Sequence, residues 1–139
     1  MKPPAVVDTN VVVAGLITSA VDSPVARVLD GMLAGAFSFL VSTNLLDEYR
    51  QVLLRPKISS LHGLSEAQID RILGEIIANA KLRSAVAGAN PPDRADDHLW
   101  ALLQSSPGAV LVTGDKRLLE NPPSFGSVVT AADYLSIYS

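Results

Sequence analysis

The sequence contains no cysteine, so neither a disulfide framework nor a thiolate metal site is available to it. It has only two histidines, His62 and His98, and they do not have the spacing of a metal-binding pair. Any metal ion would therefore have to be held by oxygen ligands. The absence of cysteine also suits a reducing compartment, and we expect a cytoplasmic protein.

Long apolar runs are missing as well. The longest ones are far too short to span a membrane, and the first residues, MKPPAVVD, lack the apolar stretch and the cleavage site of a signal peptide. Of the 139 residues, 48% are hydrophobic and only 18% are charged. This composition suits one compact domain with a sizeable core, so we expect a single soluble domain over residues 1–139, with no membrane association.

An excess of basic residues is the third absence. The formal net charge is -3 at pH 7, whereas a protein that binds nucleic acid generally needs clustered Lys and Arg to neutralise phosphates. The composition by itself thus argues against a general nucleic-acid binder. Whether the acids repel RNA depends on where they lie along the chain.

The apolar periodicity predicts strands that alternate with helices. Strands are predicted at 5–8, 37–42, 109–113 and 127–130, and helices at 23–34, 43–54, 65–80 and 94–104, with a short helix after Thr130. Capping signals support two of the helices, since Ser23 precedes a proline and Ser65 forms a capping box with Gln68. The alternation predicts an α/β fold, a three-layer α/β/α sandwich around a parallel sheet of about four to five strands.

Two acids directly follow predicted strands. Asp8 ends the strand AVV, and Asp115 follows AVLVT after a glycine. In a parallel sheet, ligands bind beyond the carboxyl ends of the strands, and both acids are expected at that edge. Simpler readings stay open, because Asp8 could be a helix N-cap and Asp115 a solvated turn residue.

Two further acids are singled out by helical phase. In the helix at 43–54, Glu48 lies at the border of the apolar stripe, whereas Asp47 falls on the opposite side. Glu48 could equally be an exposed acid at the edge of an amphipathic helix. In the helix at 94–104, Asp96 falls inside the apolar face and Asp97 points away, as does His98. Asp96 could also complete a capping box begun by Asp93.

Asp8, Glu48, Asp96 and Asp115 would bring four carboxylates from separate elements to one edge. Their mutual repulsion would raise their pKa values unless a divalent cation neutralised them. Carboxylate ligands favour the hard cations Mg²⁺ or Mn²⁺. Such an ion can activate a water molecule and stabilise the charge that develops during in-line attack on phosphorus.

Four segments together carry a family resemblance: VVDTNVVVAGL, LVSTNLLDEYRQVLLRPK, DRADDHLWALL and VLVTGDKRLL. In this order and spacing they resemble the PIN-domain family of metal-dependent ribonucleases, in particular its VapC-like branch of toxins from toxin–antitoxin pairs. The resemblance covers almost the whole chain. It implies cleavage of RNA with Mg²⁺ or Mn²⁺ as cofactor, a small antitoxin protein as partner, and a homodimer.

Carried over position by position, the resemblance implies a metal-binding and catalytic role for the four acids Asp8, Glu48, Asp96 and Asp115. The implied polar neighbours of the site are Asn10, Ser42, Thr113 and Asp97. The branch often has a proline where this chain has Arg94, so the third acid is Asp96, Asp97 or Asp93. Helical phase favours Asp96.

Outside the candidate site, acidic and basic residues nearly balance. Without the four site acids, ten of the 14 acids remain against 11 basic residues, so the rest of the protein need not repel RNA. Five basic residues follow closely on the site acids and are candidates for RNA phosphate contacts, although each could be an ordinary surface charge: Arg50, Arg55, Lys57, Lys116 and Arg117.

Two other functions fit the sequence less well. A non-catalytic PIN-type module that binds RNA or a protein would be expected to lack one or more of the acids, and all are present in the sequence. A phosphohydrolase of the haloacid dehalogenase type would need a second aspartate two residues after Asp8, where this chain has Asn10. The sequence therefore favours a metal-dependent endoribonuclease.

Overall fold

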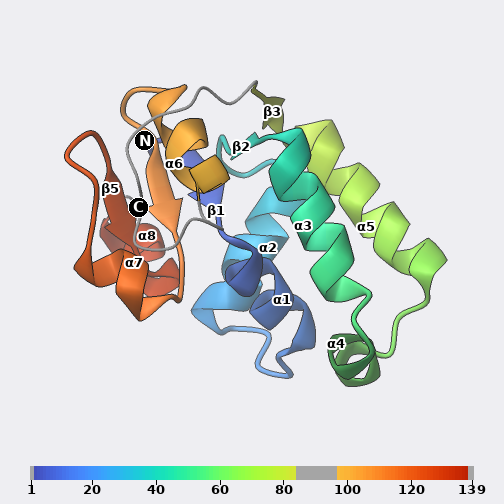
Figure 1. Ribbon diagram of the computed structural model, residues 1–139. Coiled ribbons are helices and arrows are strands. Elements are labelled where there is room, and N and C mark those ends of the chain that lie inside the picture. The colour runs from blue at the N-terminus through green and yellow to red at the C-terminus, as the bar shows by residue number, and fades with distance from the viewer. Residues whose placement is uncertain (1, 84–96, 138–139) are drawn as a thin grey trace.

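The computed structural model describes residues 2–83 and 97–137 (Figure 1). The elements in chain order are β1 (Ala5–Val7), α1 (Thr9–Ile17), α2 (Pro24–Ala34), β2 (Leu40–Val41), α3 (Thr43–Leu53), α4 (Pro56–His62), α5 (Glu66–Asn79), β3 (Lys81–Leu82), α6 (Asp97–Gln104), β4 (Val110–Val112), α7 (Lys116–Glu120), β5 (Ser127–Val129) and α8 (Ala131–Ile137). Within these described segments, no helix has both the length and the apolar character needed to cross a membrane.

The strands are short and all run parallel. One sheet has the order β1-β4-β5, with Ala5 opposite Val110, and β2 pairs with β3 in a second, two-stranded sheet. An isolated bridge between Ala5 and Phe39 joins the two sheets, and the Ala5 N–H donates to the Ser38 carbonyl oxygen at 3.0 Å. The predicted parallel sheet is thus confirmed, although its main part has three strands.

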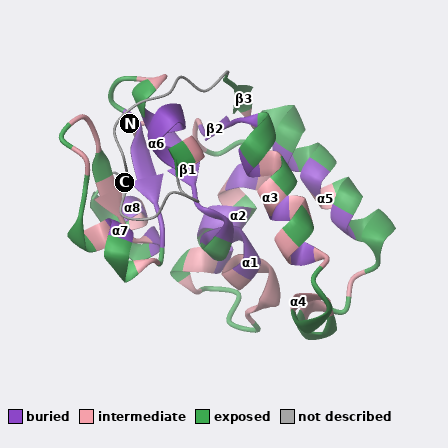
Figure 2. Ribbon diagram, in the orientation of Figure 1, coloured by how far each residue is buried: buried purple, intermediate pink, exposed green. Residues whose placement is uncertain are grey.

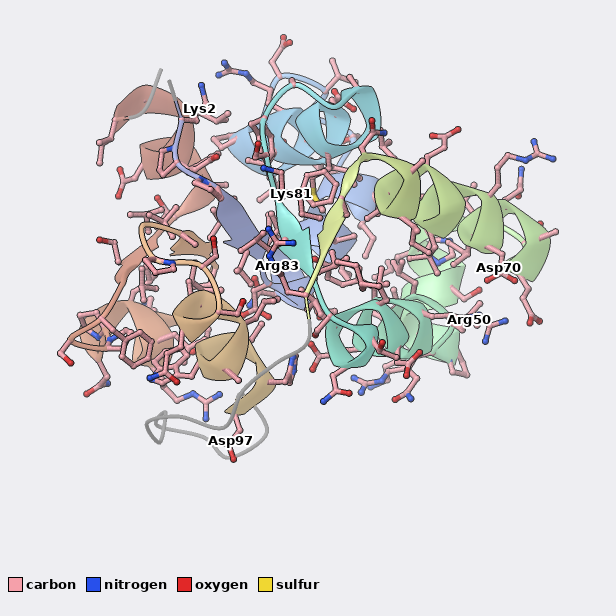
Figure 3. All side chains as sticks on the ribbon, turned by 90° about the horizontal axis from the view of Figure 1, so that it is seen from above. Lys2, Arg50, Asp70, Lys81, Arg83 and Asp97 are labelled. Carbon is pink, nitrogen blue, oxygen red and sulfur yellow. The ribbon has the colours of Figure 1, made fainter. Side chains whose placement is uncertain are left out.

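Helices cover both faces of the strands. Seen from above, α2 and α8 lie on one side of β1, and α3 and α6 lie on the other (Figure 3). The contacts agree, because α2 packs on α8 while α6 packs on α3, β1 and β4. The α/β fold class predicted from the sequence is confirmed.

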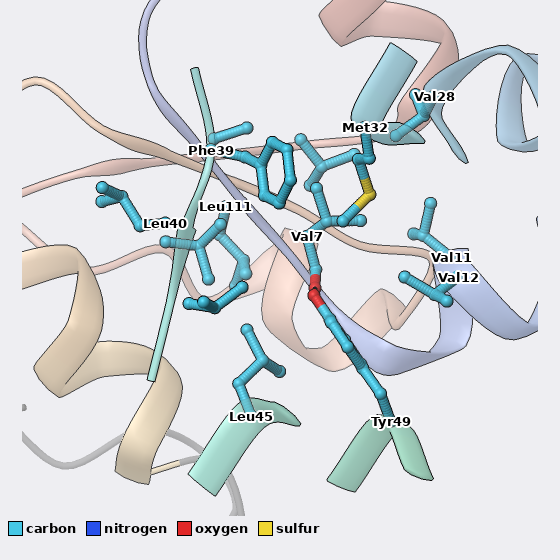
Figure 4. Packing of buried hydrophobic residues seen from close by; sticks show 14 of the residues in the cluster. Val7, Val11, Val12, Val28, Met32, Phe39, Leu40, Leu45, Tyr49 and Leu111 are labelled. Carbon is cyan, nitrogen blue, oxygen red and sulfur yellow. Dashed lines mark hydrogen bonds between the residues drawn. The ribbon is translucent and has the colours of Figure 1, made fainter. Parts of the chain in front are cut away.

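The buried core holds α3 against the carboxyl end of β1. All residues of β1 and β4 are buried (Figure 2). Leu45 and Tyr49 of α3 reach into the cluster around Val7 (Figure 4), and the Tyr49 hydroxyl donates to the Val7 carbonyl oxygen at 2.5 Å. Glu48 is the neighbour of Tyr49 in the chain, so this packing also sets the place of Glu48 beside the end of β1.

Most of the predicted elements are present, some of them shorter. Ser23 caps α2, Ser65 and Gln68 form the capping box of α5, and the Thr130 hydroxyl accepts the Asp133 N–H at 3.1 Å at the start of α8. Residues 94–96 of the predicted helix lie outside the described residues.

Four elements were not predicted from the sequence: α1, α4, α7 and β3. In α1, Val11, Val12 and Val13 are all buried, so no polar face revealed the helical period. Three consecutive β-branched residues also have weak helix propensity. Tertiary burial therefore decides the conformation of this segment.

Candidate functional site

Asp8 lies at the carboxyl end of β1 and begins α1. Its N–H donates to the Val112 carbonyl oxygen at 2.9 Å, which continues the pairing of β1 with β4. The side chain is the N-cap of α1, because Oδ1 accepts the Thr9 N–H at 2.8 Å. Its other oxygen, Oδ2, accepts the Thr113 hydroxyl at 2.8 Å and the Asn10 side-chain amide at 3.2 Å. Capping and a place at the strand edge are thus compatible.

Burial raises the pKa of Asp8 above its ordinary value of 3.8, because the side chain is only 6% exposed. Hydrogen bonds from Thr113 and Thr9 oppose this rise, and repulsion from Glu48 and Asp115 adds to it. The repulsion expected among the acids is therefore present at Asp8, but desolvation is the larger cause.

A network of hydrogen bonds ties the end of β4 to the start of α1. The Gly114 N–H donates to Asn10 Oδ1 at 3.0 Å, and the Asp115 N–H donates to Thr113 Oγ1 at 3.0 Å. The Asn10 amide also donates to Thr113 Oγ1 at 3.3 Å. Asn10 and Thr113, both predicted as polar neighbours of the site, hold the loop that carries Asp115 next to Asp8.

Glu48 approaches this network from α3. The Thr9 hydroxyl donates to Glu48 Oε2 at 2.5 Å, and the Glu48 side chain is 35% exposed, whereas Asp47 is exposed on the outer side of the helix. Thr9, which the sequence analysis did not single out, thus contacts both acids: its N–H binds Asp8 and its hydroxyl binds Glu48. Its only sequence signal was its place directly after Asp8.

His98 was expected to point off the apolar face of its helix, and that prediction is wrong. The side chain is 12% exposed, with Nε2 at 3.7 Å from Glu48 Oε2. Residues 99–103 of α6 are all buried, so the enclosed arc of the helix is wider than the helical phase suggested. The His98 Nδ1 atom is buried, and no described group pairs with it.

Asp115 is held by a neighbouring cation. Its carboxylate accepts the Arg117 N–H at 2.9 Å, and the Arg117 guanidinium contacts Oδ2 at 2.9 Å and Oδ1 at 3.3 Å. Arg117 lowers the pKa of Asp115, which is the opposite of the direction expected from repulsion alone. Asp115 is also the N-cap of α7, a role that was not predicted for it.

Three of the predicted polar and acidic site residues are not placed at the site: two lie away from it, and one is outside the described residues. Ser42 is buried as the N-cap of α3, where its hydroxyl accepts the Leu45 N–H at 3.1 Å. Asp97 begins α6 and points away from the body of the protein (Figure 3). Asp96, like the alternative Asp93, lies outside the described residues, so its role stays a prediction.

The basic candidates are spread over different surfaces. Arg50 points from α3 to α5 (Figure 3), where it pairs with Asp70 at 2.9 Å and Glu66 at 2.6 Å. Arg55 is exposed and lines the same pocket as the acids. Lys57 and Lys116 are exposed. Contact of any of them with RNA stays a prediction.

The acids surround one pocket of about 630 Å³, which Asp8, Glu48 and Asp115 all line. Oxygen donors of this kind suit Mg²⁺ or Mn²⁺, and the like charges around Asp8 would be relieved by such an ion. In the part of the chain that is described, no three acids or histidines form a ready metal-binding group. The Arg117 guanidinium forms an ion pair with the Asp115 carboxylate, so a metal ion would compete with Arg117 for this carboxylate.

Comparisons with known proteins bear on the family and the fold. The family profile of the PIN domain matches residues 4–117. A search of curated proteins finds no match. The fold is similar to the solved structure of the T. brucei RRP44 PIN domain, with a TM-score of 0.51 and 13% identity, over 98% of this chain and 80% of that one. At this identity the structural likeness concerns the fold alone. The chain belongs to the PIN domain family, whose fold is that of a nuclease.

Proposed function

We propose that this protein is a metal-dependent endoribonuclease that hydrolyses phosphodiester bonds of RNA. The observation that carries the proposal is the pocket in which Asp8, Glu48 and Asp115 meet at the carboxyl ends of β1 and β4. The raised pKa of Asp8 supports it, because a buried carboxylate near other acids is typical of a functional site. PIN domains are generally nucleases, and this family property supports the proposed chemistry.

In this proposal Asp8, Glu48, Asp115 and the undescribed Asp96 hold Mg²⁺ or Mn²⁺. A bound divalent ion supplies an activated water and stabilises the charge that develops on phosphorus. Thr113 and Asn10 orient Asp8, and Thr9 orients Glu48 through its hydroxyl. Asp115 becomes available when Arg117 moves away from it.

The test is cleavage of a mixed-sequence single-stranded RNA by the purified protein with Mn²⁺, Mg²⁺ or EDTA. We expect cutting with metal only, and its loss in Asp8→Asn with an unchanged circular dichroism spectrum. Cutting that persists in EDTA, or in Asp8→Asn, would refute the metal-dependent mechanism.

Matched pairs of acids make the test specific for position. Glu48→Gln should abolish cleavage, whereas Asp47→Asn on the exposed side of the same helix should leave it within about twofold of the wild type. Asp96→Asn should likewise abolish cleavage, and Asp97→Asn should do much less. If Asp97→Asn is inactive and Asp96→Asn is active, the helical phase assigned to this segment is wrong.

The finer proposal is that the protein acts in the cytoplasm as the toxin of a toxin–antitoxin pair. A small antitoxin would then cover the acidic edge, and the toxin would form a homodimer. Induced expression should arrest growth, and expression of Asp8→Asn at the same level should not. Light scattering of the purified protein measures the expected dimer mass.

A non-catalytic PIN-type binding module is the alternative. The ion pair between Arg117 and Asp115 favours this alternative, because it engages one of the carboxylates that would bind the metal ion. Well-folded protein that binds neither Mn²⁺ nor Mg²⁺ in calorimetry, and cuts no RNA, would support this alternative over the nuclease.

A further inference from the structure

Arg117 forms an ion pair with an acid that lines the pocket of the candidate site. Its guanidinium contacts Asp115 Oδ2 at 2.9 Å and Oδ1 at 3.3 Å, so that it engages both carboxylate oxygens. Arg50, by contrast, pairs with Asp70 and Glu66, and neither of these acids is among the described residues that line the pocket. The ion pair of Arg117 therefore bears on the site itself.

This ion pair lies in contact with solvent. The side chain of Arg117 is 60% exposed, and that of Asp115 is 23% exposed. An ion pair with this much solvent around it contributes little to the stability of a fold, because water screens the charges and each side chain loses freedom. The folded structure would therefore lose little if the guanidinium left the carboxylate.

Backbone contacts hold Asp115 independently of the guanidinium. The Asp115 N–H donates to Thr113 Oγ1 at 3.0 Å, and Asp115 Oδ1 accepts the backbone N–H of Arg117 at 2.9 Å as the N-cap of α7. Neither contact involves the side chain of Arg117. Rotation of that side chain alone would thus expose the carboxylate to another cation and leave the loop and α7 in place.

The guanidinium of Arg117 also suits a phosphate. Its planar fork of donors matches the oxygens of a carboxylate and of a phosphate in the same way. The fork belongs to the second residue after Asp115, so it stays beside the pocket when it leaves the carboxylate. A phosphate at the acids needs such a partner, because Asp8, Glu48 and Asp115 all line this pocket and their charges oppose an anion.

We propose that Arg117 is an exchangeable counter-ion of the site: it pairs with Asp115 in the metal-free protein and passes to an RNA phosphate when a divalent cation binds Asp115. Arg117 thereby couples the two ligands, so that metal and RNA each strengthen the binding of the other. The inference rests on the nuclease function proposed above and deepens it by naming the residue that links metal binding to substrate binding.

The size of the coupling follows from the ion pair. Metal alone must separate Arg117 from Asp115, and so must RNA that takes up the guanidinium. When both bind, the pair is separated only once, so the coupling equals the strength of the pair. For an exposed ion pair this is a factor of about two to five in affinity. Loss of Arg117 should therefore raise metal affinity and lower the coupling by the same factor.

The test uses Arg117→Gln, the conservative variant Arg117→Lys, and Lys116→Gln, which removes the same charge from the exposed neighbouring residue. Calorimetry measures the affinity of each protein for Mn²⁺ and for Ca²⁺, which carboxylate oxygens also bind. Fluorescence anisotropy measures the affinity for a labelled RNA in EDTA and in Ca²⁺, and a gel verifies that the RNA stays intact. Melting temperatures verify that each variant is folded.

We expect Arg117→Gln to bind both metal ions about two- to fivefold more tightly than the wild type. The factor by which Ca²⁺ raises RNA affinity should fall about two- to fivefold in the same variant. Arg117→Lys should recover part of both effects, because an ammonium keeps the charge but lacks the fork. Lys116→Gln should change metal affinity less and leave the effect of Ca²⁺ on RNA affinity as in the wild type.

The proposal is overturned if Arg117→Gln binds metal no more tightly than Lys116→Gln does, or if Ca²⁺ raises its RNA affinity as much as that of the wild type. A lower melting temperature with unchanged metal affinity would mean that the ion pair only stabilises α7. Either result leaves metal-dependent cleavage, if observed, intact as the function. The expected changes in binding without any cleavage would support the exchange and refute only the nuclease activity.

Discussion

At the scale of single residues, Thr9 connects two acids that lie 40 positions apart in the sequence, Asp8 and Glu48. Its backbone N–H binds Oδ1 of Asp8 at 2.8 Å and its hydroxyl binds Oε2 of Glu48 at 2.5 Å. Such contacts orient ligating side chains and affect metal affinity as strongly as some ligands do. In the proposed metal site, Thr9 would therefore act as a positioning residue, without itself contacting the reacting atoms.

Thr9→Val replaces the hydroxyl by a methyl group of similar size, and Thr9→Ser keeps the hydroxyl. We expect Thr9→Val to lower Mn²⁺ affinity and kcat by about 10- to 100-fold, because Glu48 loses the hydrogen bond that orients it. Thr9→Ser should restore most of both, and KM for RNA should change little. Calorimetry and initial rates measure these effects. Equal values for the two variants would show that Thr9 only fills space.

Asp8 gives a pH prediction at the same scale. Its pKa is raised in the folded protein, so the folded state binds this proton more tightly than the unfolded chain does. The contribution of Asp8 to the free energy of unfolding is therefore most favourable below about 3.8 and declines as pH rises through the raised value.

Urea unfolding of the wild type and Asp8→Asn in EDTA, over a series of pH values, isolates this contribution. The difference in unfolding free energy, wild type minus Asp8→Asn, should fall as pH rises, because the other carboxyl groups cancel in the subtraction. A difference that rises with pH would mean that Asp8 is stabilised as the charged form.

At the scale of elements, the close packing of α1 on α2 depends on Gly15. A Cβ at this position would lie 2.7 Å from the Val25 carbonyl oxygen and 3.0 Å from the Leu29 Cβ, so the helices would have to move apart. Gly74 in α5 is the opposite case, since a Cβ there would meet nothing within 4 Å.

Gly15→Ala should destabilise the protein by about 1–3 kcal/mol, the usual cost of overpacking. Gly74→Ala should stabilise it by about 0.5–1 kcal/mol, because alanine loses less conformational entropy in a helix. Chemical denaturation measures both. Because α1 also carries Asp8 at its N-cap, Gly15→Ala should impair cleavage as well, and an unchanged rate would show that the site tolerates movement of α1.

At the scale of the whole molecule, the proposed metal site would couple metal binding to stability. The three described acids come from the ends of β1 and β4 and from α3, so an ion bound among them would link segments that separate on unfolding. A ligand that binds only the folded state stabilises it by an amount set by its concentration relative to Kd.

Mn²⁺ at about 100 times its Kd should add about 2.7 kcal/mol to the free energy of unfolding. Thermal melts should show an upward shift that EDTA reverses and that Asp8→Asn lacks. Arg117→Gln should increase the Mn²⁺ affinity, because it removes the cation that now occupies Asp115. A melting temperature of the wild type that does not respond to metal would contradict the carboxylate site.

Much of the fold follows from local pattern. Apolar runs, helical periodicity and capping residues predicted β1, α2, α3, α5 and β4, and placed Asp8 and Asp115 at the carboxyl ends of strands. Three of the elements that were not predicted, α4, α7 and β3, are short. In α1, by contrast, apolar residues surround the helix, so that no periodicity remains. Burial overrides propensity at such positions.

The sequence by itself determined most of the main elements and the strand ends at which Asp8 and Asp115 lie, because strand ends and helical phase are read from the local pattern of residues. The tertiary structure decided which groups touch: Thr9 on Glu48, His98 beside Glu48, and Arg117 on Asp115. These contacts depend on helix packing and side-chain rotamers, which no local pattern records. Because of these contacts, the acids have defined hydrogen-bond partners and shifted pKa values, which the sequence alone could not predict.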